Sequence, residues 1–237
     1  MTNKRMDRVR ERNAQVRKII IGICVLIIII CCCVFAFGSC GTTTKRNEES
    51  TGTPDKTVAI NAGDIKVYLD EAKYYLYTAQ GTYETYYLTE EKEINWKKKT
   101  KSGVTMESLV KSTVLDEICR RECMYSYHDE YGVSLSDEEK DQISIKLDNY
   151  YSQTKGELLS KIGIEKARLK KVFEKQEIAK KVENVMTFKN ENLPDEMYNN
   201  WKKANTVTAN SGWEKINFDE PIFTLEDVNG SGETSTH

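Results

Sequence analysis

The stretch "TVAINAGDIKVYLDEA", residues 57–72, marks where the folded part of the chain begins. Apolar side chains occupy every second position on both sides of a central Ala-Gly-Asp: Val58, Ile60, Ile65 and Val67. A period of two, interrupted by a glycine-containing turn, is typical of two short strands joined as a hairpin. The apolar spacing then changes to that of a helix. The stretch therefore predicts a hairpin that leads directly into a helix.

Helical spacing of apolar residues begins in this stretch and returns several times along the chain. The first helix is predicted over residues 68–80, with Gly81 ending it. The next begins at the N-cap Thr105 and stops before Gly132. A third opens at Ser136, where "SDEE" fits a capping box: the serine oxygen accepts a backbone N–H and the glutamate reaches back.

Three further helices follow the same rules. "TKGE", residues 154–157, is a second possible capping box for a short helix, and Gly163 separates that helix from a long one. Pro194 suits the first turn of a last helix, because its missing N–H is not needed there. Residues 82–104 are interpreted as a long connection with some helical turns, and "NTVTANSGWEKINF", residues 205–218, as extended. The predicted fold is mainly α, with an N-terminal hairpin and a returning C-terminal strand.

The N-terminal region has the features of an export segment. Residues 1–18 carry seven basic and two acidic side chains, and the apolar run Ile19–Phe37 is long enough to span a bilayer as a helix. The small residues before Cys40 resemble a bacterial lipobox, which predicts cleavage and lipidation at Cys40. The alternative is an uncleaved signal anchor. Both predict a chain attached to the membrane, by lipid at Cys40 or by Ile19–Phe37, with the rest on the extracytoplasmic face.

Composition divides the chain into four parts: a signal or membrane segment (1–40), a polar flexible linker (41–56), a helical domain (57–225) and a disordered tail (226–237). With the first 18 residues set aside, the remainder is acidic. A mildly acidic body lacks the basic patch that phosphate binding needs, so no nucleic-acid partner is expected.

Known catalytic and cofactor motifs are absent from the sequence. It has no G-x-S-x-G, P-loop, G-x-G-x-x-G or H-E-x-x-H pattern, so no catalytic residues and no cofactor are expected. Cys119 and Cys123 are four apart on one helix face, and a metal site would need two more ligands. They are interpreted as buried small hydrophobes. His128 is interpreted as a helix-end residue.

The order of these pieces resembles a known family. "VAINAGDIKV" (58–67), "SGVTMESLVKSTVLDEI" (102–118), "YGVSLSDEEKDQI" (131–143) and "GIEKARLKKVFEKQEIAKKV" (163–182) together resemble the N-terminal chaperone domain of SurA/PrsA-type foldases, which is similar to the substrate-binding part of trigger factor. The resemblance covers about residues 57–200. The parvulin isomerase domain that commonly follows in those foldases has no counterpart, because its glycine-rich segment and paired histidines are missing.

The resemblance implies a membrane-tethered chaperone, a holdase or foldase-like protein, that binds unfolded or partly folded exported polypeptides. Its expected substrate-binding residues are the aromatic residues that fit least well into the apolar stripes of the predicted helices: Tyr74, Tyr77, Tyr83, Tyr86, Tyr87 and Trp96. Two alternatives stay open. One is a cell-envelope interaction protein with a single dedicated partner, and the other is a peptidyl-prolyl isomerase with an unrecognised site.

Overall fold

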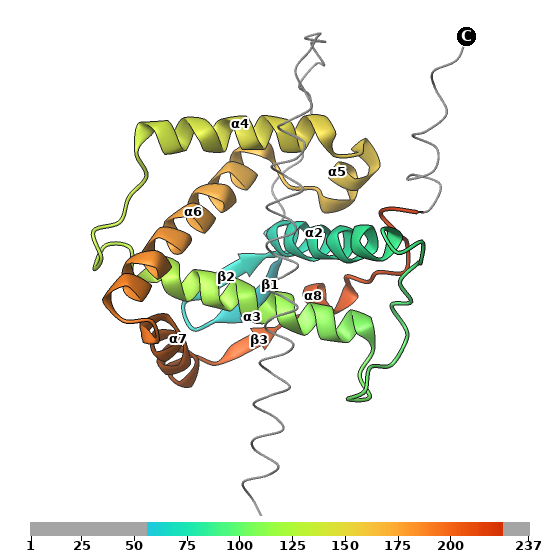
Figure 1. The fold of residues 1–237 in the computed structure, drawn as a ribbon, viewed down its shortest axis with the longest axis horizontal. Coiled ribbons are helices and arrows are strands. Elements are labelled where there is room, and N and C mark those ends of the chain that lie inside the picture. The colour runs from blue at the N-terminus through green and yellow to red at the C-terminus, as the bar shows by residue number, and fades with distance from the viewer. Residues whose placement is uncertain (1–55, 225–237) are drawn as a thin grey trace, which may run out of the picture. The chain divides into compact units, whose positions relative to one another are not determined.

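The computed structural model describes residues 56–224. The chain forms ten elements in this region: β1 (Val58–Ala62), β2 (Ile65–Tyr68), α2 (Leu69–Leu88), α3 (Met106–Ser126), α4 (Asp137–Gln153), α5 (Gly156–Ile162), α6 (Lys166–Lys189), α7 (Leu193–Ala204), β3 (Val207–Ala209) and α8 (Ser211–Lys215). The predicted mainly helical fold is therefore confirmed (Figure 1). The segment Ile19–Phe37, Cys40 and the predicted tail 226–237 lie outside the described residues.

The small sheet begins with the predicted hairpin. Strands β1 and β2 pair antiparallel, with Ala62 opposite Ile65, and Gly63 takes the positive φ of 61° that the tight turn requires. Strand β3 pairs antiparallel with the other edge of β1, which gives the order β2-β1-β3. A segment does return to the hairpin, as predicted.

The position of the returning strand differs from the prediction. The paired residues are Val207–Ala209, whereas Trp213, Glu214 and Lys215 lie in helix α8. Helix α8 packs against the start of α2, where the Leu69 side chain lies beside Gly212. The prediction that residues 205–218 are extended is therefore wrong for Ser211–Lys215, and the returning strand is not "WEKINF".

Helix α2 is longer than the sequence indicates. It continues through Gly81 to Leu88, so the predictions that Gly81 ends the helix and that residues 82–88 are connection are wrong. A glycine inside a helix costs roughly 1 kcal/mol relative to alanine. Here the side chains of Ile222 and Phe223 pack against the bare backbone at Gly81, and this contact with a distant segment overrides the local signal.

Most of the predicted helix ends are confirmed. Thr105 accepts the backbone N–H of Ser108, and Ser136 and Glu139 form a complete capping box. Gly163 ends α5 in the left-handed conformation, and Pro194 lies in the first turn of α7. The second predicted capping box is wrong, because Thr154 is the C-cap of α4 and α5 begins after Lys155 without a side-chain cap.

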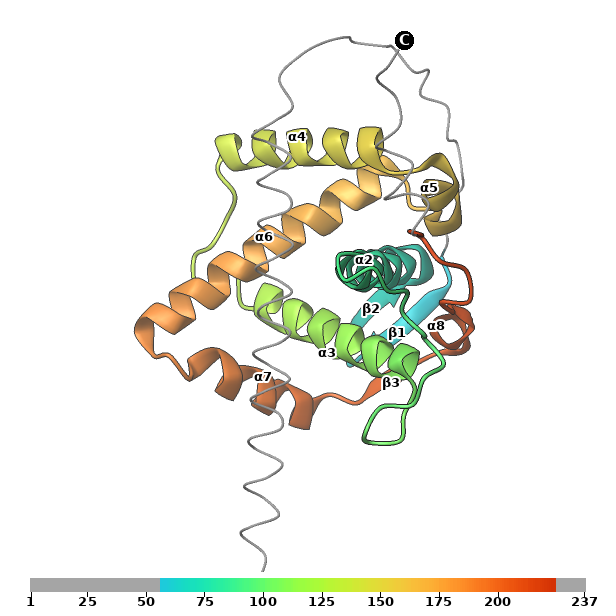
Figure 2. The same ribbon diagram turned by 45° about the vertical axis from the view of Figure 1, so that its right-hand side comes forward.

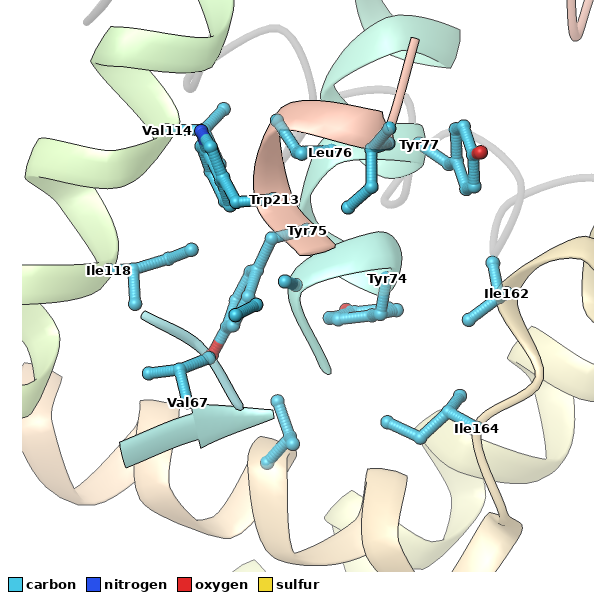
Figure 3. Packing of buried hydrophobic residues seen from close by; sticks show 14 of the residues in the cluster. Val67, Tyr74, Tyr75, Leu76, Tyr77, Val114, Ile118, Ile162, Ile164 and Trp213 are labelled. Atoms are coloured by element: carbon cyan, nitrogen blue, oxygen red, sulfur yellow. The ribbon is translucent and has the colours of Figure 1, made fainter. Parts of the chain in front are cut away.

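Helix α6 is the central support of the fold. It contacts α3, α4 and α7, and both ribbon views show it crossing between them (Figures 1 and 2). One buried cluster joins the sheet, α2, α3 and α5, and includes Tyr74, Leu76 and Trp213 (Figure 3). The second joins α3, α6 and α7 and contains Cys119 and Cys123, which are buried and unbridged, in agreement with their interpretation as small hydrophobes.

A pair of glycines tests the hairpin turn. Gly63 and Gly132 share the same positive φ, but a Cβ at Gly63 would clash with the Asn205 side chain, whereas nothing lies within 4 Å at Gly132. We expect Gly132→Ala to lower the free energy of unfolding by about 1–2 kcal/mol through backbone strain alone. Gly63→Ala should lose about 1 kcal/mol more, because the Asn205 side chain must rotate away and give up its hydrogen bond to the Trp201 carbonyl. Urea unfolding of both variants checks this, and equal losses would contradict the predicted clash.

Candidate functional site

A cleft of about 970 Å³ opens beside the N-terminal half of α6. Its other walls are strand β2, the first turn of α2, the end of α3 and the loop that leads to α4. We call it the α6 cleft and define it by Tyr68, Glu71, Tyr125, Leu135, Lys171 and Ile178. Its volume lies at the upper end of the usual range for binding sites, about 300–1,000 Å³.

Aromatic rings form two of the walls. The Arg168 guanidinium lies 4.5 Å from the Tyr68 ring centroid, and the Lys175 ammonium lies 5.8 Å from that of Tyr125. Such cation–π contacts hold a ring in place while leaving part of it available for apolar contact. Leu135 and Ile178, both half-buried, add aliphatic surface. The cleft therefore offers apolar contact beside fixed positive charge.

Both signs of charge line the rim. Lys66 comes from β2, and Lys171 and Glu174 come from α6. Glu165 is the residue directly before α6. Within residues 56–224, no carboxylate lies within ion-pairing distance of Lys66 or Lys171. A rim that carries both charges imposes no strong preference on the net charge of a ligand.

A buried charge cluster lies beside the cleft, and three of its members, Glu71, Arg168 and Lys175, line it. Asp70 and Glu71 come from the first turn of α2, where the helix dipole favours carboxylates. The Arg168 Nε lies 3.2 Å from Asp70 Oδ2. The Lys175 Nζ lies 2.6 Å from Glu122 Oε1 and 3.9 Å from Glu71 Oε1. Two carboxylates thus share one ammonium, and Glu122 takes the hydrogen bond.

Glu71 is the unusual member of this cluster. Its side chain is buried, with 5% of the residue exposed, and Oε1 has no hydrogen-bond partner in the part of the chain described. Burial raises the pKa of Glu71 to about 7, against the opposing attraction of Lys175. Burial by itself lowers the pKa of Lys175, but Glu71 and Glu122 outweigh it and raise the pKa overall. The ammonium therefore stays charged, and Glu71 carries the proton that titrates near neutral pH.

The sequence does not predict the α6 cleft, although it contains one signal for it. Arg168, Lys171, Lys175 and Ile178 are spaced three and four residues apart, so they form one stripe on α6 beside its buried stripe. A cationic stripe alone is typical of a solvated helix face. The opposite walls come from residues about 40 to 100 positions earlier in the chain. The helical periodicity of α6 does not indicate that these residues pack beside it.

The aromatic residues predicted to bind substrate lie elsewhere. Tyr74, Tyr77 and Trp96 are buried in the core (Figure 3 labels the two tyrosines). Tyr83 and Tyr87 are half-buried, and Tyr86 is 40% exposed. None of the six lines the α6 cleft.

Contacts among the six are pairwise. Tyr83 meets Trp96 with ring centroids 6.1 Å apart, and Tyr86 meets Tyr87 at 5.9 Å. Tyr74, Tyr77 and Trp96 are core residues in this structure, so contact with a client would require the covering segments to move. Client binding by Tyr86 and its neighbours stays a prediction.

Other chemical groups do not converge on a site in the described region. His128 follows the end of α3, where its ring stacks on Tyr125 with a centroid distance of 4.8 Å. Among residues 56–224, no group of three or more His, Cys, Asp or Glu side chains is arranged to hold a metal ion. Over the same residues, no helix is both long and apolar enough to cross a membrane.

Comparison with known proteins gives no relative for this chain: no family model, no curated protein and no solved structure matches it.

Proposed function

We propose that residues 57–224 form a polypeptide-binding module of the SurA/PrsA chaperone type, tethered to the extracytoplasmic face of the membrane by the N-terminal segment. The observation that carries the proposal is the α6 cleft, which is open and combines aromatic and aliphatic walls with a rim of both charges. Apolar walls cover the hydrophobic side chains of an unfolded segment. A rim of mixed charge tolerates many sequences, as a chaperone for exported polypeptides requires.

The mechanism is equilibrium binding. An exposed apolar segment of a client enters the cleft, contacts Tyr68, Tyr125, Leu135 and Ile178, and leaves when its own folding competes. Weak affinity suits release without an energy source, and the sequence contains no nucleotide-binding motif. Tethering raises the local concentration of the module where polypeptides emerge from the membrane.

Two assays on the full chain in nanodiscs test the proposal. The first measures aggregation of a chemically unfolded client by light scattering, and the second measures prolyl isomerisation of a model peptide. We expect suppression of aggregation at equimolar ratio without isomerisation. No suppression with several unrelated clients would overturn the chaperone proposal, and isomerisation above the uncatalysed rate would support the isomerase alternative.

A matched pair of variants connects the assay to the α6 cleft. Leu135 is half-buried on the cleft wall, whereas Ile145 on α4 is 48% exposed and lies outside the cleft. We expect Leu135→Ser to raise the concentration needed for half-suppression by about fivefold or more, since one aliphatic contact is worth roughly 1–3 kcal/mol. Ile145→Ser should leave it unchanged. Equal effects of the two changes would place client binding elsewhere.

The second candidate, an envelope protein with one dedicated partner, is favoured by a different observation. Phe188 near the end of α6 is 94% exposed, and Val185, three residues earlier on the same face, is 36% exposed. Aromatic residues, Phe included, are enriched in protein–protein interfaces relative to the rest of the surface. Phe188→Ser should leave aggregation suppression unchanged under the chaperone proposal. Loss of suppression with this variant would favour the patch over the cleft.

A further inference from the structure

The C-terminal part of the described chain lies across α2 as a bound peptide would. Residues 216–223 follow α8 and cover the face of α2 that carries Tyr77, Gln80, Gly81 and Glu84. We call this face, with the packed loop residue Trp96, the α2 groove. The segment Asp219–Thr224 within it lies outside any helix or strand, and its first three side chains are exposed.

Main-chain atoms supply most of the hydrogen bonds in the α2 groove. Glu84 Oε2 accepts the backbone N–H groups of Ile222, at 2.7 Å, and Phe223, at 3.0 Å. Gln80 Nε2 donates to the Glu220 carbonyl at 2.8 Å. These contacts recognise the backbone of an extended segment, so they would accept other sequences.

Side chains add one demanding contact and several permissive ones. Ile222 is buried, and the ring of Phe223 lies over Gly81, where an added Cβ would come within 3.1 Å of it. The Lys155 ammonium lies 5.5 Å from the Phe223 ring centroid, and Lys161 pairs with the exposed Glu220 at 3.2 Å. The groove thus requires an aliphatic residue at the position of Ile222. It favours an aromatic residue after it, although Phe223 is 36% exposed, and it only weakly selects what precedes them.

The chain's own segment does not use every group of the groove. Gln80 is fully buried, yet its Oε1 has no hydrogen-bond partner in the described region, and Pro221 has no N–H to donate. Two of the predicted client-binding residues lie at the groove. Trp96 meets Phe218 of the C-terminal part of the chain, with ring centroids 4.7 Å apart. The Tyr77 ring lies 4.8 Å from the ammonium of Lys161, which pairs with Glu220.

We infer that the α2 groove is a second polypeptide-binding site, which the chain fills with its own residues 219–224 and which client segments with an aliphatic–aromatic pair enter by displacing them. The inference rests on the proposed function for the identity of the competitor. The tethered segment acts at an effective concentration of about millimolar, so only an abundant or tightly binding client displaces it. The segment thereby restricts binding to conditions in which unfolded polypeptide accumulates.

A peptide of the chain's own sequence tests the inference directly. The probe is fluorescein-labelled DEPIFT, residues 219–224, and the protein is the full chain in nanodiscs carrying Ile222→Asp and Phe223→Asp, which vacate the groove. We expect saturable binding by fluorescence anisotropy, at least tenfold tighter than to the wild-type chain. Adding Gly81→Leu should abolish it, because the leucine occupies the space of Phe223 while favouring the helix. The peptide DEPDDT is the control and should not bind.

A second measurement uses the wild-type chain and does not depend on the variants folding. Hydrogen exchange of the Ile222 and Phe223 amides should accelerate at least tenfold when an excess of unfolded client is added, because displacement exposes them to solvent. If circular dichroism shows the vacated variant unfolded, exchange alone decides. Unchanged exchange, or no binding of DEPIFT to a folded vacated variant at millimolar concentration, overturns the inference.

The outcomes also separate this inference from the proposed function. Leu135→Ser changes the α6 cleft and should leave DEPIFT binding unchanged. If DEPIFT binds but aggregation of clients is not suppressed, the groove is a peptide site in a protein that is not a chaperone. If clients are protected while DEPIFT fails to bind, the proposed function holds and the second site does not exist.

Discussion

Glu84→Ala is expected to lower the free energy of unfolding by about 4 kcal/mol, which is most of the stability of a marginal domain. The Glu84 carboxylate is 3% exposed and accepts four hydrogen bonds. Oε1 accepts from Gln80 Nε2 at 2.8 Å and Trp96 Nε1 at 3.2 Å, and Oε2 accepts from two consecutive backbone N–H groups. Each buried donor left without a partner costs roughly 1–3 kcal/mol. In the alanine variant at least the backbone N–H groups of Ile222 and Phe223 would lose their acceptor.

Two controls give the Glu84 measurement its meaning. Glu84→Gln keeps the shape and one oxygen acceptor, so it should lose about half as much as the alanine variant. Glu90→Ala removes an exposed carboxylate near the end of the same helix region and should stay within about 0.5 kcal/mol of wild type. Urea unfolding monitored by Trp fluorescence measures all three. A loss below about 1 kcal/mol for Glu84→Ala would mean that the C-terminal segment does not depend on this carboxylate.

The contacts of α2 with the C-terminal segment also show which features of the fold the sequence could not predict. The hairpin, the caps at Thr105 and Ser136, and the start of α7 are set by residues within a few positions of one another, and all were predicted correctly. The continuation of α2 past Gly81 depends on Ile222 and Phe223, about 140 residues away. No local pattern contains that contact, so the glycine was interpreted by its usual role as a helix stop.

The candidate sites show the same division between local and distant information. Trp96 and Tyr77 do not fit the helical spacing of apolar residues, which predicts a role in binding. In the structure Trp96 packs against Phe218 of the C-terminal segment, and Tyr77 packs against Lys161 of α5. The α6 cleft was not predicted, because its walls at residues 66–71, 125–135 and 165–178 meet only through the packing of α6 on α3. A buried acid such as Glu71 is also invisible in sequence, since acidic residues in a first helical turn are normally solvated.

Glu71 should make the stability of the fold depend on pH in a direction opposite to that of most carboxylates. Its pKa is about 7 in the folded state and near 4.5 when the chain is unfolded, so the folded state binds the extra proton between these values. Its stabilising contribution is fully present below about pH 4.5 and is lost as the pH rises through 7. A difference of about 2.5 units corresponds to roughly 3 kcal/mol.

The groups that face Glu71 determine whether the effect can be isolated. Lys175 and Arg168 come from α6, Glu122 from α3 and Asp70 from α2 itself, and Glu71 has no hydrogen-bond partner at Oε1 among the described residues. Glu71→Gln keeps the shape and stays neutral at every pH. We therefore expect Glu71→Gln to match wild type near pH 4.5 and to exceed it by up to about 3 kcal/mol at pH 8.

Urea unfolding between pH 4.5 and 8 measures this difference, and taking variant minus wild type removes the contributions of all other titrating groups that the two chains share. Glu71→Asp retains an ionisable carboxyl and should retain the slope, even if the shorter side chain lowers stability at every pH. A difference between Glu71→Gln and wild type that stays constant with pH would mean that Glu71 is ionised throughout, with Lys175 shared equally by Glu71 and Glu122. In that case the glutamine variant should be the less stable chain at pH 8, because Lys175 would lose one of its two carboxylates.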